Sequence, residues 1–210
     1  MYDLEEQEQI DALKAWWKAN GRFVMAVVVA AAVAAAGTAG WQWYKRSQSQ
    51  EAGALYAALE KAVRANDAKQ VRETAAQLTQ KYGSTVYGPL AALAAAKVNY
   101  EAGDAAGAAA QLQWVVEHAR DDDVVAIANL RLAGVQLDRK KYDEALKLLE
   151  ASHPEAFEGL FADRRGDVYV GQSKLNEARS AYKLALEKLP ADSSYRAVVQ
   201  IKLDGLGHEK

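Results

Sequence analysis

Residues 159–192 read GLFADRRGDVYVGQSKLNEARSAYKLALEKLPAD and carry the clearest fold signal in the chain. Two small residues, Gly166 and Ala178, stand 12 positions apart, and Tyr182, Ala185 and Pro190 follow Ala178 at offsets of 4, 7 and 12. Small residues allow two helices to cross closely, the tyrosine ring fills the space beside the crossing, and proline ends the second helix. The stretch therefore predicts a pair of packed antiparallel helices.

This spacing resembles the tetratricopeptide pattern, and earlier parts of the chain repeat it. Ala145, Ala108 and Val71 precede Ala178 at successive intervals of 33, 37 and 37 residues. Gly103-Asp104 and Asn66-Asp67 supply turns inside the two earliest pairs. We expect an all-α domain over residues 47–210, built as a tetratricopeptide-like α-solenoid of about four helix pairs.

Residues 193–206 predict one further helix that caps the solenoid. A terminal repeat without a cap would expose apolar surface. We expect three apolar residues to cover the last pair: Val198, Ile201 and Leu206. We expect three polar residues to face water: Arg196, Gln200 and Lys202.

Toward the N-terminus, residues 23–40 read FVMAVVVAAAVAAAGTAG without a single charge. Extended to Tyr44, the segment has 22 residues, and a helix of that length spans about 33 Å, enough to cross a bilayer. Trp16-Trp17 and Trp41–Tyr44 flank it, as an aromatic belt requires. The sequence predicts a single transmembrane helix over residues 23–44. The alternatives are a cleaved signal peptide and a buried helix of a soluble core.

Residues 1–22 place acids first and bases last, and they predict a short leader helix at the membrane surface, interrupted near Asn20-Gly21. The leader is either a docking segment or a solvated flank. Charge does not decide the orientation, because the three basic residues before the anchor, Lys14, Lys18 and Arg22, are matched by three soon after it, Lys45, Arg46 and Lys61. Within the anchor, Ala32, Ala36 and Gly40 recur every fourth residue. Such a face permits close helix approach and is a candidate transmembrane contact.

Composition and motifs indicate binding rather than chemistry. The chain has no cysteine, which excludes disulfides, zinc-thiolate sites and thiol catalysis, and its net charge of −2 does not indicate nucleic acid. The three histidines, His118, His153 and His208, lack a second ligand at metal-binding spacing on a helix, and no phosphate-binding or nucleophile motif occurs. Asp121–Asp123 lacks the alternation of a calcium loop and predicts a helix cap instead. We expect no enzyme activity, no cofactor and no metal.

Helical repeat arrays bind partners on a concave face lined by the first helix of each pair. The repeat frame places Asp138 and Val170 near that face, together with the candidate binding residues Lys97, Tyr100, Arg131, Arg164 and Asp167. Arg131 and Arg164 lie 33 residues apart, at equivalent positions, and so predict a short basic ladder. The alternative is that these are ordinary solvated residues, or ion pairs such as Arg164 with Asp167.

Over nearly its full length the chain resembles the YfgM family of bacterial inner-membrane proteins. The residues that carry the resemblance are Trp16-Trp17, Asn20-Gly21, Gly40-Trp41, Trp43-Tyr44, Tyr87-Gly88, AAAQL at 108–112, NLRLA at 129–133, Arg165-Gly166 and the run Ala178–Ala181. The alanine-rich anchor and the degenerate first repeat depart from the family.

The resemblance implies a cytoplasmic leader (1–22), a transmembrane helix (23–44) and a periplasmic domain (47–210). It also implies a non-enzymatic role beside the SecYEG translocon with the chaperone PpiD, acting on newly exported, still unfolded envelope proteins. The rival hypothesis is a membrane-anchored periplasmic scaffold for envelope assembly or division that uses the same groove on a folded partner.

Overall fold

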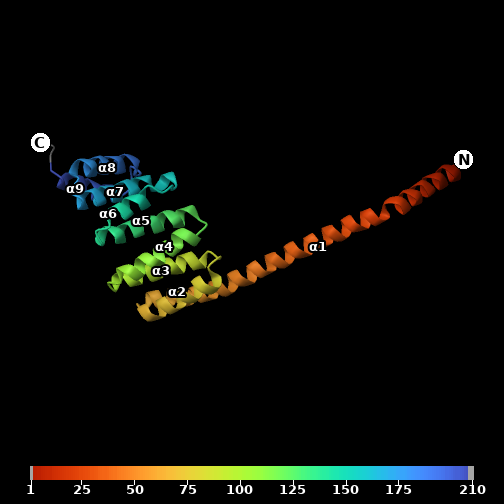
Figure 1. Ribbon diagram of the computed structural model, residues 1–210, viewed down its shortest axis with the longest axis horizontal. Coiled ribbons are helices and arrows are strands. Elements are labelled where there is room, and N and C mark those ends of the chain that lie inside the picture. The colour runs from red at the N-terminus through yellow and green to blue at the C-terminus, as the bar shows by residue number, and fades with distance from the viewer. Residues whose placement is uncertain (1, 208–210) are drawn as a thin grey trace. The chain divides into compact units, whose positions relative to one another are not determined.

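The computed structural model describes residues 2–207, and all regular structure in this range is helical (Figure 1). His208 lies outside the described residues. The helices are α1 Tyr2–Arg64, α2 Ala68–Tyr82, α3 Tyr87–Glu101, α4 Ala105–His118, α5 Asp122–Asp138, α6 Tyr142–Leu149, α7 Glu158–Gly171, α8 Leu175–Lys188 and α9 Tyr195–Gly205, with a 3-10 turn at Glu155–Phe157. The chain divides into two units, one ending at Gln48 and one from Ser49 onward.

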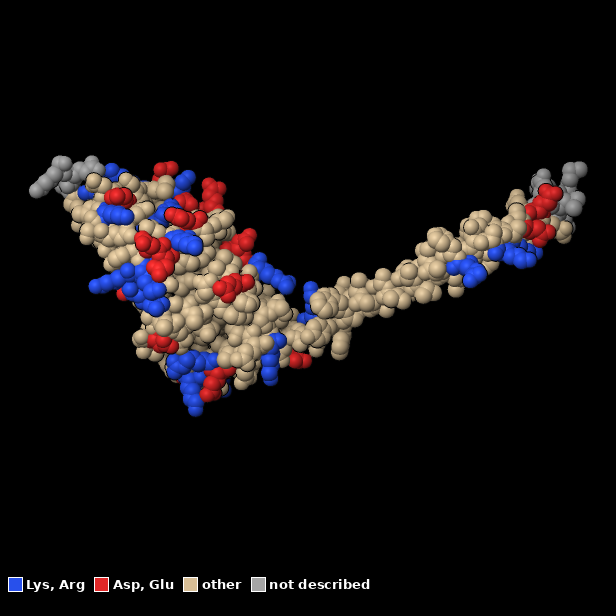
Figure 2. Space-filling model, viewed as in Figure 1, with Lys and Arg blue, Asp and Glu red and all other residues tan. Residues whose placement is uncertain are grey.

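The first unit consists of the N-terminal part of α1. Among the described residues, α1 is the helix that is long and apolar enough to cross a membrane, and no residue of its most apolar stretch is buried. Figure 2 shows this stretch without Lys, Arg, Asp or Glu. The rings at its two ends pair within the helix, Trp16 with Trp17 at 6.5 Å and Trp41 with Tyr44 at 6.0 Å between centroids.

The predicted interruption at Asn20-Gly21 is wrong, because α1 continues through both residues. The Asn20 amide donates a hydrogen bond to the Trp16 carbonyl, 3.1 Å away. The Trp17 indole covers Gly21, where a Cβ would lie 3.2 Å from its nitrogen. Glycine inside a helix costs only about 1 kcal/mol relative to alanine, so good helix formers on either side outweigh it.

The second unit is the predicted array of four helix pairs and a cap. Residues 49–64 of α1 pair with α2, and the following pairs are α3/α4, α5/α6 and α7/α8, with α9 last; in Figure 1 the helices from α2 onward follow one another in chain order. Four apolar clusters each join three successive helices, for example Leu59 of α1, Leu78 of α2 and Ala91 of α3. A core that passes from pair to pair in this way is that of a solenoid.

Each pair turns through the same backbone conformation. Asn66, Gly103, Lys140 and Ser173 all have positive φ, between 53° and 80°. They are separated by 37, 37 and 33 residues, and each stands five positions before the small or β-branched residue that set the repeat frame. All four of those residues are buried: Val71, Ala108, Ala145 and Ala178. The sequence intervals therefore correspond to a repeated local structure.

Close packing at the last pair follows the expected arrangement. Ala178 is fully buried, and a Cβ placed on Gly166 would overlap the Tyr182 ring, so only glycine lets α7 approach this ring. The predicted helix cap is also confirmed: the Asp121 carboxylate accepts hydrogen bonds from the backbone N–H groups of Asp123 and Val124, at 3.0 and 3.2 Å.

Of the three apolar residues predicted to cover the last pair, Leu206 does so, and the prediction is wrong for the other two. Val198 and Ile201 are exposed, whereas Val199 is fully buried and packs with Leu203, Leu206 and other residues of the last cluster. Lys202, expected in water, is part-buried and donates to the carboxylates of Asp163 and Asp167. Arg196 is part-buried and donates to the carbonyls of Leu186 and Leu189, while Gln200 is exposed as expected.

Candidate functional site

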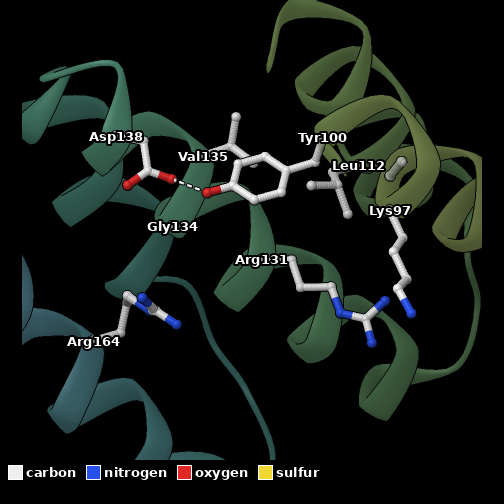
Figure 3. Close-up of a pocket in the computed structure, with 9 residues that line it drawn as sticks. Lys97, Tyr100, Leu112, Arg131, Gly134, Val135, Asp138 and Arg164 are labelled. Carbon is white, nitrogen blue, oxygen red and sulfur yellow. Dashed lines mark hydrogen bonds between the residues drawn. The ribbon is translucent and has the colours of Figure 1, made fainter. Parts of the chain in front are cut away.

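A groove of about 520 Å³ lies among the first helices of the second, third and fourth pairs. Lys97 and Tyr100 come from α3, Arg131 and Asp138 from α5, and Arg164 from α7 (Figure 3). The buried apolar residues Ala96, Leu112 and Val135 also line it, and Gly134 leaves room beside Arg164. Helical spacing explains the convergence, because equivalent residues of stacked helices fall on one face.

Four of the five candidate groove residues thus lie together: Lys97, Tyr100, Arg131 and Arg164. The fifth, Asp167, is not part of the lining. It accepts hydrogen bonds from Tyr182 at 2.8 Å and from Lys202 at 3.0 Å, so its charge is taken up by the cap. Val170 is likewise absent from the lining. That these residues bind a partner remains a prediction.

A hydrogen bond inside the groove escaped sequence reasoning. The Tyr100 hydroxyl donates to the Asp138 carboxylate, 2.5 Å away, across 38 residues of sequence. This bond, together with the charge of Asp138, raises the pKa of Tyr100 and keeps the hydroxyl a donor. The acceptor, Asp138, is the single acidic residue of the lining, so the groove's only carboxylate already has a hydrogen-bond donor.

The three cations of the groove differ in their partners. Lys97 lies 3.7 Å from Glu101 in an exposed pair, and Arg164 lies 3.4 Å from Asp167. The Nε atom of Arg164 is buried and has no hydrogen-bond partner among the described residues. Within the same range no ion pair forms at Arg131. The lining has a formal charge of +2, from three cations and one carboxylate.

A second polar cluster lies under the cap. Lys202 Nζ is 2.9 and 2.8 Å from the two oxygens of Asp163, and Tyr195 donates to Asp163 at 2.7 Å. Burial disfavours the ammonium, but the bonds to Asp163 and Asp167 outweigh it and raise the pKa of Lys202. The cluster joins α7 to α9 through hydrogen bonds among its own members.

A third cluster holds the connection between α6 and α7. The His153 ring stacks on Phe161 with centroids 3.7 Å apart and contacts Glu158 at 2.9 Å, and Arg165 donates to the same carboxylate at 2.6 Å. Sequence reasoning missed it because helix spacing does not apply to a loop histidine. Among the described residues, no group of three or more His, Asp or Glu side chains is placed to hold a metal ion.

The small face of the anchor is exposed along its length. Ala32, Ala36 and Gly40 have no packed neighbour in the first unit, and a Cβ on Gly40 would meet nothing within 4 Å. The other faces of the same stretch are equally exposed, so a contact through the small face remains a prediction.

Comparison with known proteins gives consistent results. Residues 14–208 match the family described as tetratricopeptide repeat-like domain. The chain is 36% identical over 204 residues to the "Ancillary SecYEG translocon subunit" of Neisseria gonorrhoeae, covering 97% of this chain and 98% of the relative. It is 29% identical over 202 residues to the protein of the same name from Escherichia coli, covering 96% of each.

Among solved structures, a MamA fragment from Desulfovibrio magneticus superimposes with a TM-score of 0.55, covering 74% of this chain and 92% of the fragment. At 16% identity this similarity concerns the fold alone. It agrees with the helical array described above.

Proposed function

This chain belongs to the YfgM family of ancillary SecYEG translocon subunits with a tetratricopeptide repeat-like domain, and from this premise we propose that it is a non-enzymatic accessory subunit of the translocon. The observation that carries the proposal is similarity over nearly the whole of both chains, including the apolar segment. A relative that shared only the repeats would support a helical array and nothing more.

The proposed arrangement is a single-pass anchor over residues 23–44 with a cytoplasmic leader and a periplasmic array over residues 47–210. Support comes from the uncharged stretch of α1 and from the family. Tethering an array beside a translocon raises the effective concentration of its groove for neighbouring proteins, so weak contacts suffice. Contact through the small face of Ala32, Ala36 and Gly40 would add a second attachment.

The proposed partners are SecYEG, the chaperone PpiD and exported proteins that are still unfolded. The groove is a suitable surface because it joins charged and apolar side chains on one face, and because two of its polar residues are accessible: Tyr100 is 46% exposed, and Arg131 is also exposed.

The test is purification of the tagged full-length chain from native membranes in mild detergent. We expect SecYEG subunits and PpiD to co-purify in amounts that follow the tagged chain. A tagged truncation that keeps the leader and the anchor but lacks the array separates the contribution of the anchor from that of the array. Recovery of envelope-assembly proteins without any SecYEG subunit would refute the proposal and favour the scaffold hypothesis.

A further inference from the structure

The charge and the floor of the groove together define a ligand class. Its rim carries Lys97, Arg131 and Arg164, and its floor is formed by buried apolar side chains, Leu112 and Val135 among them. Cations gathered in a concavity with low-dielectric walls attract anionic groups more strongly than the same cations on a flat surface. The apolar floor in turn favours a ligand that also presents apolar side chains.

The partners of the cations make this charge available. Arg131 forms no ion pair within residues 2–207, and the buried Nε of Arg164 has no hydrogen-bond partner there. The one carboxylate of the lining, Asp138, is engaged by the Tyr100 hydroxyl at 2.5 Å. The exposed Arg131 guanidinium, and the part of the Arg164 guanidinium that is accessible on a side chain 35% exposed, can therefore donate charge-assisted hydrogen bonds to a carboxylate.

We infer that this groove binds an extended protein segment in which acidic side chains alternate with apolar ones. The inference rests on the proposed function, since it names the chemistry of a partner segment for the same array. Alternation fits because successive side chains of an extended chain point to opposite sides, so acids reach the rim while apolar residues reach the floor. A net charge of +2 suits a short acidic segment better than a nucleic acid, whose recognition uses broad basic patches.

The test is fluorescence anisotropy with the full-length chain in nanodiscs of zwitterionic lipid. The probe is a fluorescein-labelled peptide of about ten residues, long enough to cross the groove when extended, with Asp and Glu alternating with Val and Leu. Its control carries the amide in place of every acid, and a duplex DNA oligonucleotide serves as the general polyanion. We expect the acidic peptide to bind at about 0.1 M salt and to weaken strongly at about 1 M, while both controls bind at least ten-fold more weakly.

Variants then locate the site. Arg131→Gln and Arg164→Gln should each weaken binding by about ten-fold. Arg72→Gln makes the same charge change at an exposed position of α2 and should leave binding unchanged. Asp138→Asn should strengthen binding by about three-fold, a gain that damage to the fold would not produce. Gly134→Leu should block the groove without changing its charge, since a Cβ there meets Arg164 only at ordinary contact distance. If Arg164→Gln fails to fold, Arg131→Gln, a change at an exposed position, still tests the inference.

Equal binding of the acidic and amide peptides would overturn the inference, as would equal sensitivity to Arg72→Gln. Equal affinity for DNA would identify a polyanion site and would overturn it too. Failure of this inference can be told apart from failure of the proposed function: if SecYEG still co-purifies while the peptide fails to bind, only the ligand class is wrong.

Discussion

The ion cluster under the cap gives the sharpest prediction about stability. Lys202→Met keeps the apolar stem and removes the ammonium. The Asp163 carboxylate, with only 2% of its side chain exposed, then loses its cationic partner. Its remaining donor is the Tyr195 hydroxyl. Removing one member of a buried ion pair costs about 3–5 kcal/mol, and because Lys202 is 27% exposed we expect the lower end, about 3 kcal/mol.

For a unit of this size, 1 kcal/mol corresponds to about 2–4 °C in Tm, so the variant should melt about 6–12 °C below the parent. The assay is thermal unfolding of residues 47–210 followed by circular dichroism near neutral pH. Because the pKa of Lys202 is raised, its contribution is fully present below the ordinary value of 10.5 and is lost only as the pH rises through the folded value. Neutral pH therefore measures the whole effect.

Two comparisons make this prediction refutable. Lys183→Met, an equivalent change at an exposed position of α8, should leave Tm within about 2 °C of the parent. The double variant Lys202→Met/Asp163→Asn should recover part of the loss, since no charge is then stranded. An unchanged Tm for Lys202→Met, or a double variant that loses the sum of the single effects, would show that the cluster does not hold the cap.

Further predictions concern the other parts of the chain. Ala178→Arg forces a long charged side chain into a fully buried helix crossing and should lower Tm by an amount equivalent to about 1–3 kcal/mol or more, and an unchanged Tm would contradict the repeat frame. Burial opposes ionisation of Glu158, but its bonds to Arg165 and His153 outweigh this and lower its pKa; Glu158→Gln should therefore reduce Tm at neutral pH, and the difference should disappear as the pH falls well below 4.5, the ordinary value. Ala36→Leu/Gly40→Leu should leave membrane insertion intact and reduce co-purification with SecYEG, whereas equal recovery would exclude this face as a contact.

The repeat architecture was predictable because it depends on local spacing. The intervals of 33 and 37 residues fix the helix pairs, and the same intervals separate the residues of positive φ from Asn66 to Ser173. A close helix crossing admits only small residues, so Gly166 and Ala178 indicate where the helices of the last pair cross. Four of the groove residues could be named for the same reason, since they follow from the frame.

The cap could not be oriented from its sequence because α9 is apolar on two sides. Val198 and Ile201 define one stripe, and Val199 and Leu203 define another. The second stripe packs on the last cluster and is accompanied by the contact between Lys202 and Asp163, residues separated by 39 positions, and no local period contains that information. The Tyr100–Asp138 bond and the His153 cluster depend equally on tertiary contacts.

The leader shows a different limit. An Asn-Gly pair is a strong turn signal in most contexts, yet α1 passes through it, because the Trp17 ring covers Gly21 and the flanking residues favour a helix. The ends of the membrane-crossing segment are therefore not marked by helix ends, and the bounds 23–44 remain a prediction from the aromatic flanks.

The most direct test of the account is photocrosslinking in native membranes. A photoreactive amino acid replaces Lys97, whose side chain is 67% exposed at the groove rim, and a control carries it at the exposed Arg72 of α2. The account predicts adducts with SecYEG subunits or PpiD from position 97, and markedly fewer from position 72. Adducts only with proteins unrelated to the translocon, or translocon adducts only from position 72, would contradict it.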